Sequence, residues 1–159
     1  MNSFETSNFK FFTYDFNNKL DVEFIKELIE DEDTDRYLKS IVAFINKDSF
    51  NPLKTAYLVS NNDNIVGYLN LYEENRIVEL DLAVGPKHRG IKNNSNETIG
   101  CQILKEASNY LFDNYIFIRY LRGMIAKSNI KSIKTALNAG FVYYGSYSEG
   151  EEYRKYKSK

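Results

Sequence analysis

Residues 77–104 read IVELDLAVGPKHRGIKNNSNETIGCQIL, and this stretch decides the fold. Its beginning predicts a β-strand, because aliphatic side chains occupy every second position from Val78 to Val84. The alternate positions carry Glu79 and Asp81, so one face of the strand is apolar and the other presents two carboxylates. We therefore expect the carboxylate face to border a functional site.

The loop after this strand is basic and leads into a helix predicted from about Asn96 to Asp113. It offers Lys87, His88, Arg89 and Lys92 just before the helix N-terminus. Backbone N–H groups and the helix dipole favour anions at such a position. The pattern predicts a phosphate-binding site, with an ordinary charged surface loop as the alternative.

Length and composition restrict the possible functions. The 159 residues predict one domain spanning 1–159, and a net charge of −1 argues against a nucleic-acid partner. Cys101 and His88 are the only residues of their types, so the chain lacks the parts of a cysteine-based metal cluster or a Ser-His-Asp triad. We expect no metal. Without a signal-like leader or a membrane-spanning apolar run, we expect a cytoplasmic protein with no membrane partner.

The rest of the chain alternates strand and helix patterns. Strands are predicted at 9–14, 55–60, 65–72, 118–125, 141–147 and 152–156. Helices are predicted after a cap at Asp21, over 37–45, and from a cap at Ser128 or Asn129 to a stop at Gly140. The order β-α-α-β-β-β-α-β-α-β-β predicts an α/β (α+β) fold: a single mixed sheet of about seven strands with helices on both faces.

This order, with four local patterns, resembles the GNAT superfamily of N-acetyltransferases over almost the whole chain. Val84-Gly85-Pro86 ends its strand as the family's fourth strand commonly ends. Arg89-Gly90 and Ile99-Gly100 resemble the two ends of the family's Arg/Gln-x-x-Gly-x-Gly/Ala pyrophosphate loop. Asn129-x-x-Ser132, followed by Ala139-Gly140-Phe141, resembles the family's Asn-containing helix and the Gly-Phe before its sixth strand.

The resemblance implies transfer of an acetyl group from acetyl-CoA, as co-substrate, to a primary amine of a small molecule or peptide. The amine substrate is of unknown identity, and the protein is expected to be a monomer or homodimer. The resemblance also implies a set of cofactor-binding residues: Leu82, Ala83 and Val84 through their main chain, and Arg89, Gly90, Ile91, Thr98, Ile99, Gly100, Asn129 and Ser132.

The chain departs from the family pattern in the pyrophosphate loop. Six extra residues, Lys92–Glu97, interrupt the loop, and Thr98 stands where the family has its middle glycine. Closing a longer loop costs little, about 0.6 kcal/mol per doubling, so we expect the fold to survive. The Asn-rich insertion is expected to be flexible, and Glu97 to oppose an incoming phosphate unless Arg89 and Lys92 offset its charge.

A carboxylate on the strand predicted at 77–84 is expected to act as general base. An amine with a pKa of about 10.4 is deprotonated to only about one part in 10³ at pH 7, equivalent to roughly 4.6 kcal/mol. A base can recover about 10²–10⁴-fold of that. Glu79 is the first candidate because it matches a Glu position of the family, and Asp81 is the second. The alternative is that both carboxylates pair with a neighbouring Lys or Arg.

The family's usual general acid, a Tyr in the last helix, corresponds here to Ala136. Tyr120, Tyr143 and Tyr144 are possible substitutes or, alternatively, strand aromatics packed on the sheet. Two other functions therefore stay open: a protein that binds acyl-CoA without catalysis, and a regulatory or interaction protein with a degenerate GNAT site. An acidic run over 30–35 would attract a cationic acceptor or, alternatively, forms a solvated turn.

Overall fold

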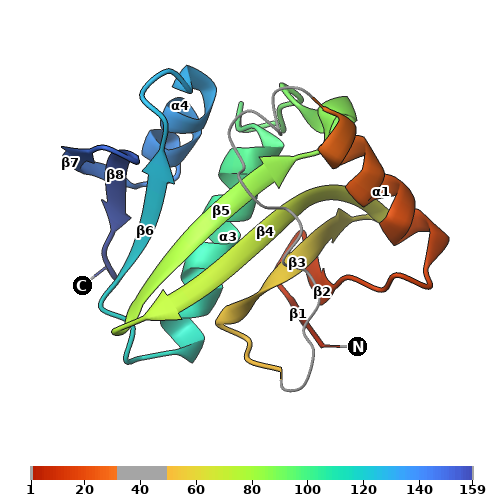
Figure 1. The fold of residues 1–159 in the computed structure, drawn as a ribbon, viewed down its shortest axis with the longest axis horizontal. Helices are drawn as coiled ribbons and strands as arrows, with labels where there is room; N and C mark the ends of the chain where they lie inside the picture. The colour runs from red at the N-terminus through yellow and green to blue at the C-terminus, as the bar shows by residue number, and fades with distance from the viewer. Residues whose placement is uncertain (1, 32–49, 159) are drawn as a thin grey trace.

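The computed structural model describes residues 2–31 and 50–158 (Figure 1). These residues form one eight-stranded sheet in the order β1-β2-β3-β4-β5-β6-β8-β7. The strands are β1 Ser3–Glu5, β2 Lys10–Thr13, β3 Lys54–Asn61, β4 Asn64–Glu74, β5 Ile77–Val84, β6 Tyr120–Ile125, β7 Val142–Tyr147 and β8 Gly150–Lys155. All neighbours are antiparallel except β5 and β6, so the predicted mixed sheet is confirmed. The additional strand, β1, is too short for its alternation to be recognised.

Helices cover both faces of the sheet, as predicted. α1 (Lys19–Glu30) lies on one face, and α3 (Ile99–Asn114) and α4 (Ile130–Asn138) lie on the other (Figure 1). A short 3₁₀ helix, η1 (Pro86–His88), follows β5. The helix predicted over 37–45 and the acidic residues 32–35 lie outside the described residues. Within the described residues, no helix has both the length and the apolar character needed to cross a membrane.

Two helix starts differ from the predictions. The N-cap of α1 is Asn18, whose Oδ1 accepts hydrogen bonds from the N–H of Leu20 at 2.9 Å and of Asp21 at 3.3 Å. Asp21 lies inside the helix, buried, and its carboxylate accepts the N–H of Asp15 at 2.9 Å. The predicted cap at Asp21 is therefore wrong. α3 begins at Ile99 rather than near Asn96 because Thr98 caps it through the N–H of Cys101.

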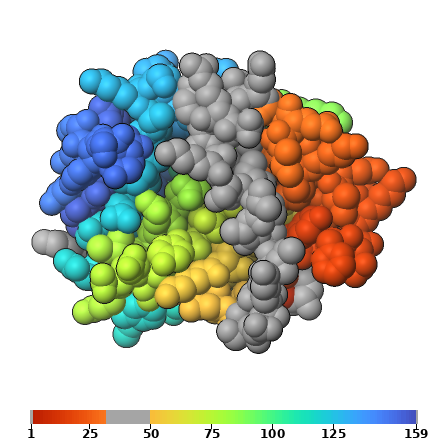
Figure 2. Space-filling view, viewed as in Figure 1, coloured from red at the N-terminus to blue at the C-terminus, as the bar shows by residue number. Residues whose placement is uncertain are grey.

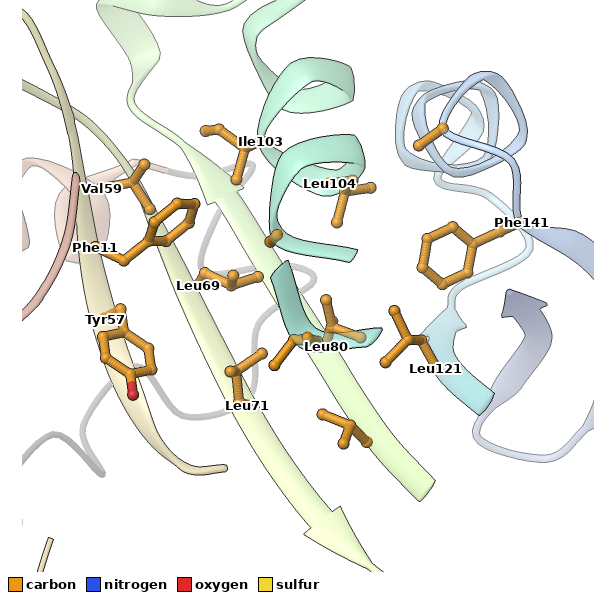
Figure 3. Packing of buried hydrophobic residues seen from close by; sticks show 14 of the residues in the cluster. Phe11, Tyr57, Val59, Leu69, Leu71, Leu80, Ile103, Leu104, Leu121 and Phe141 are labelled. Carbon is orange, nitrogen blue, oxygen red and sulfur yellow. The ribbon is translucent and has the colours of Figure 1, made fainter. Parts of the chain in front are cut away.

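Two apolar clusters lie on opposite faces of the sheet. The larger one packs β2–β6 and β8 against α3 and α4, and Figure 3 shows several of its members, among them Phe11, Leu69, Leu80, Ile103 and Leu121. The smaller one packs α1 against β2–β5 and includes Ala83. β5 therefore turns the Val78–Leu80 side toward α3, and the side that carries the two carboxylates toward the α1 face. Cys101 lies in the larger cluster, as predicted.

Candidate active site

β5 and β6 separate after a short parallel contact. β5 pairs with β4 along its whole length, from Ile77 to Val84, but its register with β6 ends at the pair Glu79↔Arg122. Beyond that pair the two strands diverge, as Figure 1 shows. Within residues 2–31 and 50–158, the last residues of β5 therefore have a strand on one side only. We call this opening the splay.

The splay leaves specific main-chain groups without a strand partner. The N–H of Gly85 donates to Val66 O on β4 at 2.7 Å. Because main-chain groups alternate along a strand, Ala83 also faces β4, whereas Leu82 and Val84 direct their N–H groups toward the splay. Of the three residues expected to contact the thioester, Leu82 and Val84 direct their N–H groups toward the splay, and the main chain of Ala83 is used by the sheet.

The N-terminus of α3 packs directly against the splay. Gly100 lies so close that a Cβ there would come within 3.2 Å of Val84 Cγ2, 3.3 Å of Thr135 Cγ2 and 3.6 Å of Leu82 Cδ2. A side chain at this position would have to push Val84 and Thr135 back by a few tenths of an ångström, so glycine favours the close meeting of β5, α3 and α4. The first N–H groups of a helix have no partner within the helix, so those of Ile99 and Gly100 are available to an anion.

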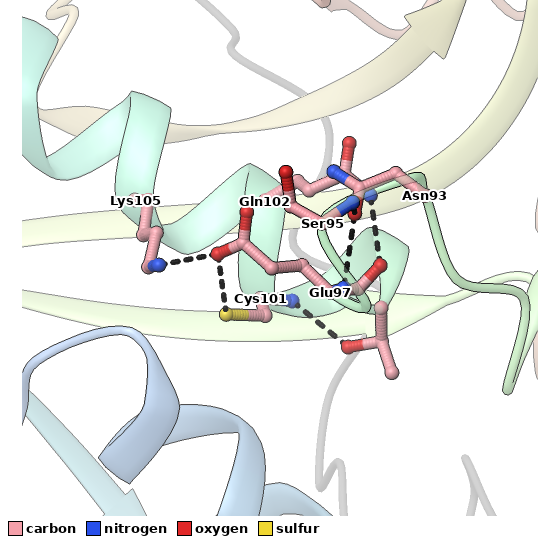
Figure 4. Close-up of polar contacts among 7 residues, drawn as sticks. Asn93, Ser95, Glu97, Cys101, Gln102 and Lys105 are labelled. Atoms are coloured by element: carbon pink, nitrogen blue, oxygen red, sulfur yellow. Dashed lines mark hydrogen bonds and ion pairs between the residues drawn. The ribbon is translucent and has the colours of Figure 1, made fainter.

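The inserted residues form an ordered hairpin rather than the flexible loop that the composition predicts. Lys92 and Thr98 form an antiparallel bridge, and the N–H of Asn93 donates to Glu97 O at 2.9 Å. The side chain of Asn93 accepts the N–H groups of Ser95 and Glu97, each at 2.9 Å (Figure 4). The 92–98 hairpin thus brings the two halves of the interrupted loop together.

The carboxylate of Glu97 is neutralised by a neighbouring lysine. Lys105 donates a hydrogen bond to it, and the Cys101 thiol lies 3.7 Å from the same oxygen (Figure 4). The hydrogen bond from Lys105 lowers the pKa of Glu97. The expected repulsion of phosphate by Glu97 is therefore offset, by a residue of α3 rather than by Arg89 or Lys92.

Arg89 is occupied by groups of the protein itself. Its Nη1 lies 2.9 Å from Asp31 Oδ2 at the end of α1, and its Nε donates to Val84 O at 3.0 Å. The guanidinium thus fastens the loop to α1 and to the end of β5. Gly90 has a φ of +76°, and Ile91 is exposed.

The two candidate carboxylates have different surroundings. Asp81 lies opposite Asn70 of β4, which hydrogen-bonds to it. Burial, with Glu79 nearby, raises the pKa of Asp81 to about 6. Burial, with Asp81 nearby, also raises the pKa of Tyr68. Within the described residues no lysine or arginine forms an ion pair with Asp81. A carboxylate that titrates near neutrality is suited to acid–base chemistry.

Glu79 instead belongs to an ion-pair network that crosses three strands. Its Oε1 lies 3.5 Å from Arg122 Nε on β6, and Arg122 Nη1 lies 4.0 Å from Glu152 on β8. Arg154 binds the same Glu152. Arg122 Nε is buried and makes no hydrogen bond within the described residues. Of the two carboxylates, Glu79 therefore forms the ion pair that was the alternative to a role as base, and Asp81 forms none within the described residues.

The remaining predicted residues lie around α4 and the last strands. Asn129 is the N-cap of α4, and its side chain accepts a hydrogen bond from the N–H of Ser132 at 3.3 Å. In this structure Asn129 thus acts as a helix cap. Ala136 is buried in the core. The three tyrosines considered as acids pack as strand aromatics: Tyr120 and Tyr144 stack on Arg154, and Tyr143 contacts Tyr153.

The fold has well-matched relatives among solved structures, although neither a protein-family model nor a curated protein matches the sequence. A GNAT-family acetyltransferase from Bacillus anthracis aligns over 96% of this chain and 96% of its own, with a TM-score of 0.71 and 14% identity. The N-acetyltransferase PseH of Campylobacter jejuni, in complex with acetyl coenzyme A, aligns over 94% and 99%, with a TM-score of 0.68 and 19% identity.

AAC(6')-Ib, in complex with paromomycin and acetyl-CoA, aligns over 96% of this chain and 94% of its own, with a TM-score of 0.69 and 13% identity. The chain has the GNAT fold. In the GNAT fold of this chain, the splay and the first turn of α3 lie next to each other, and the carboxylate face of β5 is turned toward the α1 side.

Two residues near the GNAT splay are absent from the predicted site. Asn70 was predictable: the two-residue turn at Asn75 and Arg76 fixes the β4–β5 register, and counting back from it places Asn70 opposite Asp81. Arg122 was not predictable, because no turn fixes the register of a parallel pair.

A cavity of about 240 Å³, lined by Phe4, Tyr110 and other residues, lies at the opposite end of α3, away from the splay.

Proposed function

We propose that this chain is an acetyl-CoA-dependent N-acetyltransferase acting on a primary amine. The observation that carries the proposal is the splay, where the N–H groups of Leu82 and Val84, which pair with no strand within the described residues, adjoin a carboxylate with a raised pKa, Asp81. The acetyl-CoA complexes of two structural relatives, PseH and AAC(6')-Ib, support the choice of donor.

The residues at the splay fit acetyl-CoA. The N–H groups of Ile99 and Gly100 would receive a pyrophosphate, and the nearby carboxylate of Glu97 is neutralised by Lys105. Asn129 and Ser132 lie at the start of α4, whose Thr135 approaches Gly100. Arg89 is assigned a structural role, because Asp31 and Val84 already hold its guanidinium. Bound acetyl-CoA would supply the thioester.

Asp81 is the general base in this proposal, and Glu79 is not. The amine must lose a proton as its nitrogen attacks the carbonyl carbon, and the Asp81 carboxylate receives that proton. With a pKa of about 6, Asp81 is mostly ionised at pH 7 yet more basic than an ordinary aspartate. Glu79 is engaged by Arg122, which leaves it less available.

The main chain of Leu82 or Val84 stabilises the oxygen of the reacting carbonyl. Their N–H groups are fixed by the pairing of β5 with β4, so no reorganisation is needed when charge develops. Donors of this type are worth about 2.7–4 kcal/mol in transition-state stabilisation. Asp81 and Leu82 are consecutive residues, so the base and the N–H donor are positioned by a single strand.

A second candidate function is binding of acyl-CoA without catalysis. It is favoured by the position of the usual acid, where Ala136 is buried in the core, and by the packing of Tyr120 and Tyr144 on Arg154 and of Tyr143 against Tyr153. In the transferase proposal, the departing thiolate takes its proton from solvent.

Calorimetry and a thiol-release assay separate these functions. The transferase proposal expects acetyl-CoA to bind and free thiol to appear only when an amine is added, from a panel of aminoglycosides, polyamines, amino sugars and peptides. Binding without amine-dependent thiol release would leave the second candidate. No binding at millimolar acetyl-CoA would contradict both.

Two matched variants test the choice of base. Asp81→Asn is expected to lower kcat/KM by about 10²–10⁴-fold and to remove the acid limb near pH 6 from the rate profile. Glu79→Gln should keep that limb and lose less than about tenfold, because it removes an ion-pair partner rather than the base. Acetyl-CoA affinity, measured in parallel, is expected to stay unchanged in both. The reverse result would restore Glu79 as the base.

A further inference from the structure

Arg122 on β6 carries a guanidinium that donates no hydrogen bond to any of the described residues. Its Nε lies 3.5 Å from Glu79 Oε1 and its Nη1 lies 4.0 Å from Glu152 Oε1, so both contacts are long ion pairs. Buried polar groups are normally hydrogen-bonded, and arginine has five N–H donors to satisfy. The side chain is 33% exposed, and because Nε itself is buried, a ligand would reach the two Nη atoms. Arg122 is therefore equipped to bind a ligand oxygen.

Arg122 lies where the splay begins, on the face of the sheet that carries Asp81. It pairs with Glu79 in the last register pair of β5 and β6, and its ion pair with the Glu79 carboxylate places both side chains on one face. Asp81 follows Glu79 by two residues, so its side chain leaves the strand about 7 Å further along the same face. α1 packs over β2–β5 and lies at the far side of this face from β6 and β8 (Figure 2). A small molecule with its nitrogen at Asp81 can therefore also contact Arg122.

The charges around Arg122 favour an uncharged oxygen over an anion. Glu79 and Glu152 supply two negative charges to the ion-pair network. Arg122 and Arg154 supply two positive charges, so the network is neutral. A carboxylate or phosphate brought to Arg122 would lie beside Glu79 and Glu152, which would repel it. A carbonyl or hydroxyl oxygen accepts the same N–H groups without that repulsion. Asp81 lies outside the network and, when ionised, adds the negative charge that suits a protonated amine.

We infer that Arg122 binds a carbonyl or hydroxyl oxygen of the amine substrate, and thereby selects amines that carry such an oxygen a few bonds from the nitrogen. The inference rests on the proposed function, because it assigns a second contact to the acceptor at the same site. An amine without the oxygen leaves the guanidinium unpaired, and sites built around such a donor discriminate strongly against analogues that cannot accept from it. Arg122 thus positions the substrate, and Asp81 receives its proton.

A comparison of matched acceptors tests this selection. Glycinamide carries a carbonyl, ethanolamine carries a hydroxyl, and propylamine, of similar size, carries neither. In the thiol-release assay, the better of the first two should exceed propylamine in kcat/KM by about 10–10²-fold, the effect of one hydrogen bond to a charged group. The better acceptor also identifies the kind of oxygen. Peptides, amino sugars and polyamines form the corresponding set of larger acceptors, in which the polyamines should be the poorest.

Variants of Arg122 assign the selection to its guanidinium. Arg122→Met should remove the preference, because no acceptor can then receive this hydrogen bond; general effects on the site and differences in amine basicity cancel in the ratio of acceptors. Arg122→Lys keeps the charge but not the planar fork, so we expect an intermediate preference and an unchanged acid limb near pH 6. Arg119→Met is the matched control: Arg119 is exposed and precedes β6, and its loss should leave the preference intact.

The outcomes separate this inference from the proposed function. Amine-dependent thiol release with the same acceptor ratio in Arg122→Met and the unmodified chain would overturn the inference and leave the transferase proposal standing. Equal use of propylamine and the oxygen-bearing amines by the unmodified chain would do the same. No thiol release with any amine of either set would contradict the proposed function, and the inference with it. If circular dichroism shows that Arg122→Met does not fold, the ratio in Arg122→Lys decides.

Discussion

Asp81 lowers the stability of the folded chain at neutral pH, because burial raises its pKa to about 6. In an unfolded chain an aspartate titrates near pH 3.9. Its contribution to stability is therefore complete below about pH 4 and is lost as the pH rises through about 6. Asp81→Asn should raise the free energy of unfolding at pH 7 by about 1–3 kcal/mol.

Urea unfolding at several pH values checks this prediction. The stability difference between Asp81→Asn and the unmodified chain should grow from about pH 4 to pH 6 and stay constant above. A variant that is more stable yet less active would show that the carboxylate is kept for chemistry rather than for folding. Equal stability at pH 7 would mean that Asp81 is not desolvated as the structure indicates.

Gly100 gives a second prediction at the residue scale. Gly100→Val should destabilise the fold by about 1–3 kcal/mol and weaken acetyl-CoA binding, because its Cβ would lie 3.2 Å from Val84 Cγ2. Gly123→Val is the control: a Cβ at Gly123 meets no atom within 4 Å. Thermal unfolding and calorimetry measure both effects. Equal losses in the two variants would contradict the close approach of α3 to β5.

At the scale of elements, the charge at the start of α3 should tune anion binding. Glu97→Gln would leave Lys105 without its carboxylate partner and add one net positive charge near the first turn of the helix. We expect acetyl-CoA to bind about two- to fivefold more tightly. Lys105→Gln should have the opposite effect, since Glu97 would then be uncompensated. Calorimetry at low ionic strength measures both, and weaker binding by Glu97→Gln would contradict the proposed site.

Local patterns predicted some elements better than others. β5 was predicted from its alternation, and α4 from a cap at Ser128 or Asn129 and a stop at Gly140, because each of these signals lies within a few residues of the element it defines. Asp21 was mistaken for a cap because Asn18, three residues earlier, offers the same capping chemistry. The 92–98 hairpin was missed because it depends on the conformation of Asn93, which composition does not reveal.

At the scale of the whole molecule, the sheet consists of two parts joined by a short seam. β1–β5 and β6–β8–β7 share only the pairs from Ile77↔Tyr120 to Glu79↔Arg122, and α3 and α4 pack together on one face. A ligand in the splay would contact both parts. Because acetyl-CoA would bind only the folded chain, acetyl-CoA at about 100 times its Kd should raise the free energy of unfolding by about 2.7 kcal/mol.

Hydrogen exchange with and without acetyl-CoA tests where that stabilisation occurs. We expect added protection at the end of β5, in the first turn of α3 and in α4, and little change in β1 and β2. Protection spread evenly over the sheet would indicate a general effect rather than binding at the seam. This experiment does not depend on catalysis.

The order of elements and the two-sided layering were predictable, because they follow from connections between neighbouring segments. The network of Glu79, Arg122 and Glu152 was not, since its members come from strands far apart in the sequence and meet only through the registers of β5, β6 and β8. The choice of base therefore needed the structure: sequence placed both carboxylates on one face, and only the neighbouring strands distinguish them.

The 92–98 hairpin separates the length of the loop from the positions of the residues that flank it. Because Lys92 and Thr98 already touch, residues added or removed at the tip need not move Ile91 or Ile99. Insertions or deletions at the tip therefore need not alter the splay, and we expect the fold to tolerate them with little loss of stability. For the same reason, the exposed residue Ser95 is a suitable position for a fluorescent label that leaves the proposed binding surface intact.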